Sequence, residues 1–234
     1  LKRLKRSLSE LDMQEPDAIN DLLEIHRTLV RDNQVDQGGV YLQVTRGVAD
    51  RDFIYPENVK STLVMFTQSK DILGSKLVEK GMKVISIDDL RWGRRDIKTV
   101  QLLYPSMGKM MAKSAKCDDA WMVEDGFVTE GTSNNAYIVV DNKIITRELS
   151  NDILHGITRN SVLRYAEEAQ MEIEERPFSV KEVLAADEAF ITSASTFVMP
   201  VVEIDGEPIG EGRPGKVSRR LREIYIEESR KRAI

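Results

Sequence analysis

Hydrophobic and polar residues alternate with two different periods along the chain, and each period predicts one kind of element. Near the start, apolar residues recur every three or four positions, which predicts amphipathic helices over 1–11 and 17–33. Alternation with a period of two follows in 38–48 and 61–67, which predicts two strands. We therefore expect residues 1–70 to form a small lobe of helices and strands.

The pattern changes after a polar segment that contains a glycine. Residues 71–78 are predicted to be a linker, and residues 79–234 a larger lobe in which short apolar strands alternate with single helices. Two dipeptides typical of tight antiparallel hairpins interrupt the apolar runs, Asp125-Gly126 and Asp141-Asn142. Strand meanders interrupted by single helices predict an α+β fold of two lobes.

Three local predictions concern the helices of the larger lobe. Pro105 is expected at the first position of a helix over 105–116, where the missing N–H has no partner to lose. Thr158 is a candidate N-cap for a helix over 156–170. Methionines at helical spacing in the first of these helices are expected in the core, namely Met107, Met110 and Met111.

Composition narrows the class of protein. The 234 residues are 41% hydrophobic and carry a net charge of −5, which argues against nucleic acid as a partner. The single cysteine, Cys117, cannot form an internal disulfide, so we expect a reducing, cytoplasmic location. No apolar run approaches the roughly 20 residues that span a membrane. With two histidines and one cysteine, a metal site is not expected. The helix-like start at Leu1, with no cap, suggests that a further segment precedes it.

Candidate chemistry begins with "RRDIKTVQLL", where Lys98 follows a strand over 83–87. In "ILHGITRNSV", Gly156 leads into a helix, and the free N–H groups of Ile157 and Thr158 would favour an anion. Taken alone, the first segment favours a solvated lysine and the second an ordinary capped helix.

Two more segments add to this set. In "FITSASTF", a strand runs into small hydroxyl residues around Ser193, which suit a phosphate group. In "TEGTSNN", Glu130 ends a strand and could face a cationic ring nitrogen. Their alternatives are a polar loop and a solvated turn. Together with Lys98, the segments match a cofactor that has an aldehyde, a pyridine nitrogen and a phosphate, which is pyridoxal phosphate.

Five segments carry a resemblance to a known family. They are "RLKRSL", "RWGRRDIKTVQLL", "DGFVTEGTSNNAYIV", "ILHGITR" and "ITSASTFVMPVVEIDG". Read in order, they resemble the class IV (fold-type IV) pyridoxal-phosphate-dependent aminotransferases, most closely the members that act on D-amino acids. The resemblance spans almost the whole chain. It implies a two-lobed fold with a barrel-like larger lobe, and a homodimer.

The resemblance also implies roles for individual residues. Lys98 matches the lysine that joins the cofactor aldehyde as a Schiff base, and Glu130 matches the carboxylate that pairs with the pyridine nitrogen. The other matching positions bind the phosphate or line the ring, namely Arg3, Ser133, Asn134, Leu154, Gly156, Ile157, Thr158, Ser193 and Ala194. Ala194 stands where close relatives carry a hydroxyl residue, so it offers only its backbone N–H.

The substrate is inferred from a single arginine. Arg51 matches the residue that grips the substrate carboxylate in the D-specific members, often from the neighbouring subunit. Phe53 stands where those members carry a companion histidine, and Arg46 is a competing arginine at a strand end. A tyrosine of the same pocket is expected in the preceding segment.

The expected reaction is therefore transamination between a D-amino acid such as D-alanine and a 2-oxo acid such as 2-oxoglutarate. Three alternatives stay open. They are an L-branched-chain aminotransferase, a lyase of the aminodeoxychorismate type, and a binding protein that keeps the fold without the cofactor.

Overall fold

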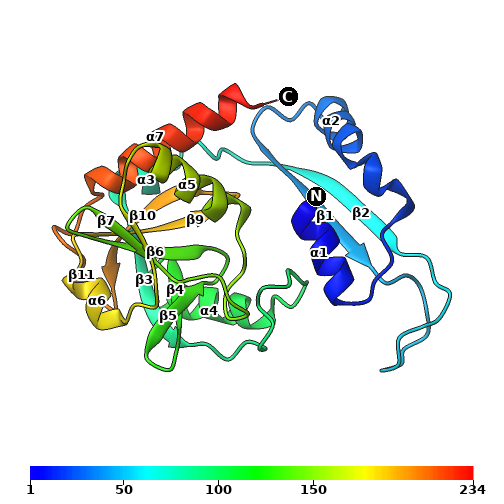
Figure 1. The fold of residues 1–234 in the computed structure, drawn as a ribbon, viewed down its shortest axis with the longest axis horizontal. Coiled ribbons are helices and arrows are strands. Elements are labelled where there is room, and N and C mark those ends of the chain that lie inside the picture. Colours follow the sequence, from blue (N-terminus) through cyan, green and yellow to red (C-terminus); the bar gives the residue numbers. More distant parts are fainter. Residues whose placement is uncertain (234) are drawn as a thin grey trace. The chain divides into compact units, whose positions relative to one another are not determined.

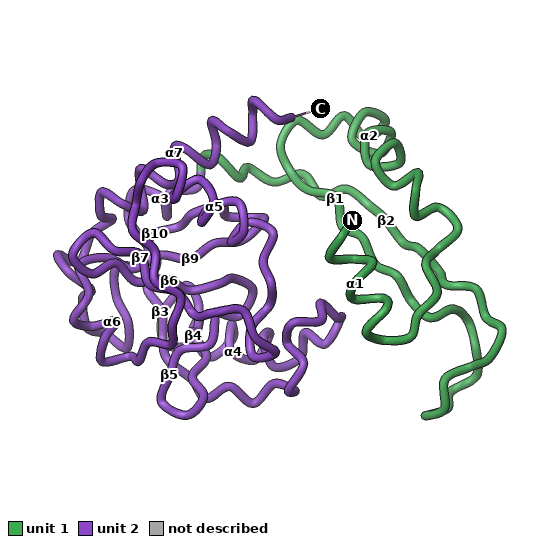
Figure 2. The backbone as a smooth tube through the Cα atoms, in the orientation of Figure 1, with its two compact units in different colours: residues 1–74 green, residues 75–234 purple. Residues whose placement is uncertain are grey.

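The chain forms two compact units in the computed structural model, which describes residues 1–233. Unit 1 is Leu1–Gly74 and unit 2 is Ser75–Ile234 (Figure 2). The division falls inside the segment 71–78, which the sequence predicts to be a linker.

Unit 1 consists of helices and one antiparallel pair of strands. Its elements are α1 (Lys2–Glu10), the 3₁₀ helix η1 (Asp17–Asn20), α2 (Leu22–Asp32), β1 (Gly38–Thr45) and β2 (Thr62–Ser69). The two strands pair from Gly38 opposite Ser69 to Thr45 opposite Thr62. The helix predicted over 17–33 is instead split, because a 3₁₀ turn ends at Asn20 before α2 begins.

Unit 2 contains a mixed sheet and five helices among its described residues (Figure 1). Its elements are α3 (Leu77–Lys80), β3 (Met82–Asp88), α4 (Leu103–Ser114), β4 (Asp119–Glu124), β5 (Phe127–Gly131), β6 (Asn135–Val140), β7 (Lys143–Thr146), α5 (Ile157–Glu168), β8 (Ile173–Glu175), α6 (Val180–Ala185), β9 (Glu188–Ser193), β10 (Phe197–Ile204), β11 (Glu207–Pro208) and α7 (Lys216–Lys231).

The sheet follows the order β5-β4-β3-β10-β9-β6-β7-β8, with β11 paired to β10. Strand β3 pairs parallel with β4 and with β10, and β7 pairs parallel with β8; the other pairs are antiparallel. Strand β5 contacts β6 although the two lie far apart in this order, and Gly131 donates its N–H to the carbonyl of Asn134. The sheet is therefore curled, which confirms the α+β, barrel-like prediction.

The two predicted hairpins are present. Residues Asp125 and Gly126 have φ of 51° and 83° between β4 and β5, and Asp141 and Asn142 have φ of 50° and 63° between β6 and β7. Two consecutive residues with positive φ match the right-handed twist of paired strands. These turns bring the ends of β5 and β6 into the site described below.

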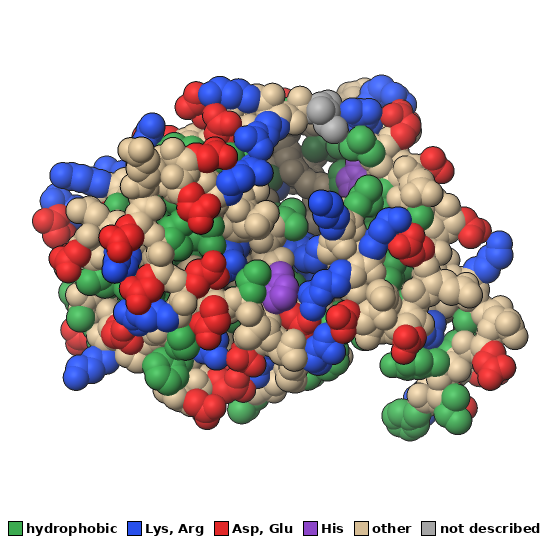
Figure 3. Space-filling view, in the orientation of Figure 1, with side chains coloured by type: hydrophobic (Ala, Val, Ile, Leu, Met, Phe, Trp, Pro, Cys, Tyr) green, Lys and Arg blue, Asp and Glu red, His purple; other side chains and the backbone are tan. Residues whose placement is uncertain are grey.

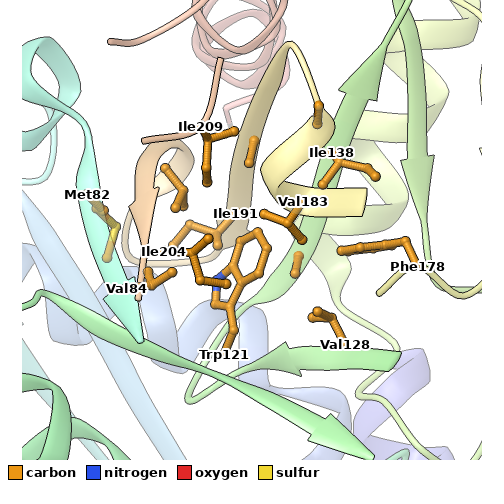
Figure 4. Close-up of a cluster of buried hydrophobic side chains, with 14 of the residues drawn as sticks. Met82, Val84, Trp121, Val128, Ile138, Phe178, Val183, Ile191, Ile204 and Ile209 are labelled. Atoms are coloured by element: carbon orange, nitrogen blue, oxygen red, sulfur yellow. The ribbon is translucent and has the colours of Figure 1, made fainter. Parts of the chain in front are cut away.

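Three clusters of buried apolar residues lie in the described part of unit 2, and the smallest of them is under α4. Inside the curl, the indole of Trp121 lies among aliphatic residues from several strands and faces Phe178 edge-on (Figure 4). On the outer side, α5 and α7 pack against a second cluster in which Tyr137 and Phe190 stack with centroids 4.5 Å apart. Each large apolar side chain buried in this way contributes about 1.5–3 kcal/mol.

Helix α4 differs from its prediction in two respects. It begins at Leu103, so Pro105 is its third residue, still in the first turn where an N–H has no partner within the helix. The methionines predicted to be core are exposed by about half, at 51%, 60% and 49% for Met107, Met110 and Met111. The buried face is formed by small residues, Gly108 and Ala112.

A close approach explains this orientation. A Cβ atom on Gly108 would lie 2.9 Å from Cδ1 of Ile87 in β3, so a glycine here lets α4 pack tightly on the sheet. The methionines therefore face away from the sheet.

The surface carries mixed charge. In Figure 3, acidic and basic side chains are interspersed over the visible face of unit 2. Within the described residues, no helix has both the length and the apolar content to cross a membrane.

Candidate active site

Glu130 is a carboxylate enclosed within unit 2. It lies near the end of β5, 4% exposed, and both of its oxygens accept hydrogen bonds. Oε1 accepts from Nη1 of Arg91 at 2.7 Å, while Oε2 accepts from Nδ2 of Asn135 at 3.0 Å and from the N–H of Leu154 at 3.1 Å. One carboxylate therefore joins β5, β6 and the loop before α5.

Arg91 is itself fixed by a second carboxylate. It donates two hydrogen bonds to Asp89, from Nε at 2.9 Å and from Nη2 at 2.7 Å. Asp89 also accepts from the hydroxyl of Thr129 at 2.6 Å. Such a two-bond arrangement fixes the guanidinium in orientation as well as in position.

Burial and charge act in opposite directions on these groups. Burial raises the pKa of Glu130 above its usual range, and the charge and hydrogen bond of Arg91 pull that pKa back down. Burial also pushes the pKa of Asp89 upward, but its bonds to Arg91 and Thr129 and the charge of Arg95 outweigh it, so the pKa is lowered. Arg91 is therefore the group that favours the charged form of Glu130.

Lys98 follows a strongly anchored loop. The side chain of Arg95 forms an ion pair with Glu124 at 2.7 Å, and the backbone N–H of Arg95 donates to the carbonyl of Asn151 at 2.9 Å. Ile97 is buried beside it. Lys98 itself is exposed and lies in the loop between β3 and α4, ten residues beyond the end of β3.

The start of α5 has the properties of an anion site. Gly156 is the N-cap and no side chain caps the helix, so the prediction of a Thr158 cap is wrong. Thr158 lies inside the first turn, and its hydroxyl is buried with no partner among the described residues. The N–H groups of Ile157 and Thr158 likewise donate to no described acceptor. An unpartnered buried hydroxyl beside a helix N-terminus favours a bound anion.

Gly156 is tied to the Glu130 site by a close contact. A Cβ atom at this position would lie 2.2 Å from Oδ1 of Asn135. The amide of Asn135 also donates to the carbonyl of Leu154 at 2.9 Å. Glycine therefore allows the helix start to approach the residue that holds Glu130.

The second hydroxyl-rich segment forms the turn between β9 and β10. Asn135 in β6 lies opposite Thr192 in β9, so the turn follows directly beside the Glu130 site. The Ser193 hydroxyl accepts from the N–H of Thr196 at 3.2 Å. Within residues 1–233, the N–H of Ala194 has no acceptor, which leaves it available to a ligand.

Ser133 and Asn134 occupy the turn between β5 and β6. Ser133 is exposed. The amide of Asn134 donates to Asp119 at 2.6 Å, and Asp119 also accepts from the hydroxyl of Thr132 at 2.5 Å and pairs with Lys109 at 3.0 Å. The side chain of Asn134 thus shapes the turn that follows Glu130.

The two remaining candidates lie in unit 1. Arg3 is in α1, and burial lowers the pKa of its guanidinium. Arg51 is in the loop between β1 and β2, with its guanidinium 5.6 Å from the ring centroid of Phe53. Arg46 donates to the carbonyl of Asp12 at 2.8 Å and lies 3.6 Å from the ring centroid of Tyr55, so its side chain holds unit 1 together.

Three residues of the site lie outside the set expected from the sequence, namely Asp89, Arg91 and Asn135. Asp89 and Arg91 belong to the loop before Lys98. An acidic and a basic residue two positions apart are the sequence signal that indicates an ion pair here. Asn135 is a polar residue that opens an otherwise apolar strand, "NAYIVV". A buried amide in such a place needs hydrogen-bond partners, and this is the property that marks it.

These groups fit pyridoxal phosphate. The unpartnered hydroxyl and N–H groups suit its phosphate, and the enclosed carboxylate suits a protonated ring nitrogen. Within the described residues, no cluster of three histidine, cysteine or acidic side chains is placed to hold a metal ion.

The model of the family named amino-transferase class IV matches residues 1–204. The chain belongs to the class IV aminotransferase family. This confirms the family, the enzyme class and the pyridoxal phosphate cofactor expected from the motifs.

Curated members of the class IV aminotransferases resemble the chain over most of its length. A D-alanine aminotransferase of Staphylococcus aureus (strain N315) is 37% identical over 225 residues, which cover 96% of this chain and 79% of that protein. A D-alanine aminotransferase of Bacillus licheniformis is 39% identical over 224 residues, covering 94% and 78%.

Solved class IV structures share the fold. A branched-chain amino acid aminotransferase from Thermobaculum terrenum, in its PLP-form, has a TM-score of 0.83 and 24% identity, covering 99% of this chain and 77% of that chain. A branched-chain amino acid aminotransferase from Escherichia coli has a TM-score of 0.84 at 21% identity, covering 95% and 74%. At these identities, both structures support the fold alone.

Proposed function

We propose that the chain catalyses pyridoxal-phosphate-dependent transamination between a D-amino acid, such as D-alanine, and a 2-oxo acid, such as 2-oxoglutarate. The observation that carries the proposal is the enclosed Glu130 carboxylate, flanked by two backbone segments whose N–H groups have no acceptor in the described residues. The two D-alanine aminotransferases support the choice of substrate.

Separate groups hold the two ends of the cofactor. The N–H groups of Ile157 and Ala194 and the hydroxyl of Thr158 bind the phosphate, with Ser193 in the same turn. The family resemblance also assigns Arg3, in α1, to phosphate binding. Leu154, Gly156, Ser133 and Asn134 belong to the loops around the ring.

Lys98 and Glu130 carry the proton chemistry. The chemistry that pyridoxal phosphate supplies when bound is an electron-withdrawing ring. Glu130, kept as a carboxylate by Arg91, holds a proton on the ring nitrogen. Lys98 would hold the cofactor through its amine, and in its unprotonated form the same amine would serve as the general base and acid for the proton on the substrate Cα.

Arg51 is the proposed substrate residue. A guanidinium binds a carboxylate through two parallel hydrogen bonds, which fixes the orientation of an amino acid. Arg46 is the weaker candidate, because its side chain is already used by Asp12 and Tyr55.

The test of cofactor attachment uses borohydride. Wild-type protein incubated with pyridoxal phosphate is expected to absorb in the near-visible region and, after reduction, to carry the cofactor on Lys98 in peptide mass spectrometry. Lys98→Ala should form no such adduct, while Lys113→Ala, at a lysine of α4, should behave as wild type. A full yield of adduct in Lys98→Ala overturns the assignment.

The test of substrate uses two amino donors with 2-oxoglutarate as acceptor. D-alanine should be converted at least about 10-fold faster than L-leucine in kcat/KM. Arg51→Lys should raise KM for D-alanine, since the second parallel hydrogen bond is lost. Faster turnover of L-leucine would favour the branched-chain alternative. Continuous release of pyruvate from aminodeoxychorismate, with no amino acceptor present, would favour the lyase alternative.

We also infer a homodimer and a cytoplasmic location. The exposed apolar face of α4 supports the dimer, because apolar residues grouped on one helix face favour a protein partner. Cys117 is a free thiol whose pKa is raised by burial, which suits a reducing compartment.

A further inference from the structure

The turn between β9 and β10 contains an unfavourable backbone conformation. Phe197, which ends this turn, has φ of +60°. Positive φ is common for glycine and asparagine, but for a bulky side chain it is an outlier that the surrounding structure must hold. The turn also carries Ser193 and Ala194, the two residues proposed to bind the cofactor phosphate.

A single arginine of α7 brackets this residue. Nη1 of Arg222 donates to the carbonyl of Thr196 at 2.7 Å and to the carbonyl of Val198 at 2.9 Å, one on each side of Phe197. Its guanidinium lies 5.7 Å from the ring centroid of Phe197. Tyr225, three residues later and on the same helix face, contacts that ring with centroids 5.3 Å apart.

The contact is buried and costly to form, which argues that it has a role. Arg222 is 5% exposed, and burial lowers the pKa of its guanidinium. The buried guanidinium needs acceptors, and the carbonyls of Thr196 and Val198 supply them. Because both carbonyls must point at Arg222, the residue between them, Phe197, is held at positive φ.

The turn is positioned at its other end by β-sheet pairing. Thr192 lies opposite Asn135, the residue that bonds to Glu130, and pairs its hydroxyl with that of Tyr137 at 2.9 Å. The β9 side is therefore set by the sheet. The β10 side is set by the contact from α7.

We propose that Arg222 is a positioning residue for the phosphate: by holding the backbone on both sides of Phe197, it keeps the turn over 193–197 in the conformation that binds the phosphate group. This inference rests on the proposed function. It assigns to the C-terminal helix a role in retaining the cofactor, which Arg222 exerts through the backbone carbonyls of Thr196 and Val198.

The first experiment measures how Arg222→Met changes the binding of pyridoxal phosphate and of pyridoxal. Arg222→Met should weaken the binding of pyridoxal phosphate by about 10-fold, the value of a hydrogen-bonded charge, and should shift the ³¹P resonance of the bound phosphate. The binding of pyridoxal, which has no phosphate, should change less than about twofold, because the Glu130 end is untouched. Arg220→Met, on the exposed side of α7, is the matched control and should match wild type.

Rescue separates positioning from a general loss of folding. Glycine adopts positive φ without strain, so Phe197→Gly combined with Arg222→Met should recover most of the affinity lost in Arg222→Met. Far-UV circular dichroism and the melting temperature of the cofactor-free proteins check that each variant folds, with Arg222→Lys as a milder change. Equal losses for pyridoxal and pyridoxal phosphate, or no recovery in the double variant, overturn the proposal.

A further measurement distinguishes this failure from failure of the proposed function. Amide hydrogen exchange of residues 194–198 in cofactor-free protein should be faster in Arg222→Met than in wild type. Suppose that wild type binds no pyridoxal phosphate, while Arg222→Met still exchanges these amides faster. Then the proposed function is wrong, but Arg222 does hold the backbone of the turn over 193–197. If wild type binds the cofactor and Arg222→Met is indistinguishable from it, the inference alone is wrong.

Discussion

The charge on Glu130 depends most on Arg91, with a smaller contribution from the N–H of Leu154. Desolvation disfavours the carboxylate, and Arg91 at 2.7 Å opposes that effect. Asp89 keeps Arg91 in place and shares its charge. The acid that is proposed to face the ring nitrogen is therefore held in its working form by residues that have no direct role in proton transfer.

Replacing Arg91 should expose this dependence. In Arg91→Met the pKa of Glu130 should rise further, because burial is no longer opposed, so the acidic limb of the pH profile of kcat should move to higher pH. At pH 7 we expect a loss of roughly 100-fold in kcat, comparable to the removal of one electrostatic group from an active site. The measurement is a pH–rate profile with D-alanine, together with the near-visible spectrum of the bound cofactor.

Arg95→Met is the matched control for this prediction. Arg95 belongs to the same loop and pairs with Glu124 and Asp89, but not with Glu130. Both variants break a buried ion pair, which typically costs about 3–5 kcal/mol of stability. Only Arg91→Met should move the acidic limb. An equal shift in the two variants would mean that the loop as a whole, and not the charge of Arg91, sets the pKa of Glu130.

The sequence identified residues whose side-chain types match a cofactor, but it did not identify the residues that hold them in place. Lys98, Glu130 and the hydroxyl-rich turn stand out because their residue types match a cofactor. Arg91 and Asn135 acquire their roles only when β5, β6 and two loops meet. Arg91 lies 39 positions and Asn135 five positions from Glu130 in the sequence. No periodic pattern of residues indicates a contact over 39 positions.

At the scale of elements, the packing of the start of α5 depends on Gly156 having no Cβ atom. Gly156 lets the helix start pack against Asn135, and Asn135 in turn bonds to Glu130 and to the carbonyl of Leu154. One glycine thus couples the proposed phosphate-binding helix start to the carboxylate that is proposed to face the ring.

Gly156→Ala should disturb both ends together. The added Cβ would lie 2.2 Å from Oδ1 of Asn135, closer than real contacts allow, so the amide must move and its bond to Glu130 is lost. We expect the dissociation constant of pyridoxal phosphate to rise by roughly 10-fold, equivalent to about 1.4 kcal/mol. Titration of cofactor-free protein followed by near-visible absorbance measures it.

Gly39→Ala in β1 serves as the control for this steric effect. A Cβ atom there meets nothing within 4 Å and the site lies in unit 1. Affinity for the cofactor should stay within about twofold of wild type, as expected for a surface substitution. If Gly156→Ala binds as tightly as Gly39→Ala, Asn135 does not couple the two ends.

Element boundaries were predicted well where a local signal decides them and poorly where packing does. The hairpin dipeptides are local signals and are confirmed. The cap of α5 was misassigned to Thr158, because a hydroxyl predicts a cap while the chain uses Gly156. The Thr158 hydroxyl has no partner among the described residues in the first turn of α5, where we propose that it binds the phosphate, and periodicity cannot indicate such a role.

At the scale of the whole molecule, the exposed face of α4 is the main feature that intramolecular packing leaves unexplained. Gly108 and Ala112 direct α4 onto the sheet, and this turns the large apolar residues outward. The exposed large apolar residues of α4 and the loop before it are Leu90, Trp92, Val100, Leu102, Leu103, Met107, Met110 and Met111. Solvent exposure of so many neighbouring apolar side chains is unusual for a monomer.

We expect this face to be buried in the proposed homodimer, and substitution should therefore separate the subunits. In the double variant Met107→Lys/Met110→Lys, two charges would be forced into an apolar interface, so sedimentation equilibrium at micromolar concentration should give the monomer mass where wild type gives twice that mass. Leu184→Lys, at an exposed apolar residue of α6, is the control and should remain a dimer. A wild-type monomer would refute the dimer itself, whereas a dimeric α4 variant would place the interface on another surface. The family resemblance implies that Arg51 acts on the site of the neighbouring subunit. On that proposal the monomeric variant should also lose transaminase activity, while its melting temperature in the cofactor-free state stays close to that of the control.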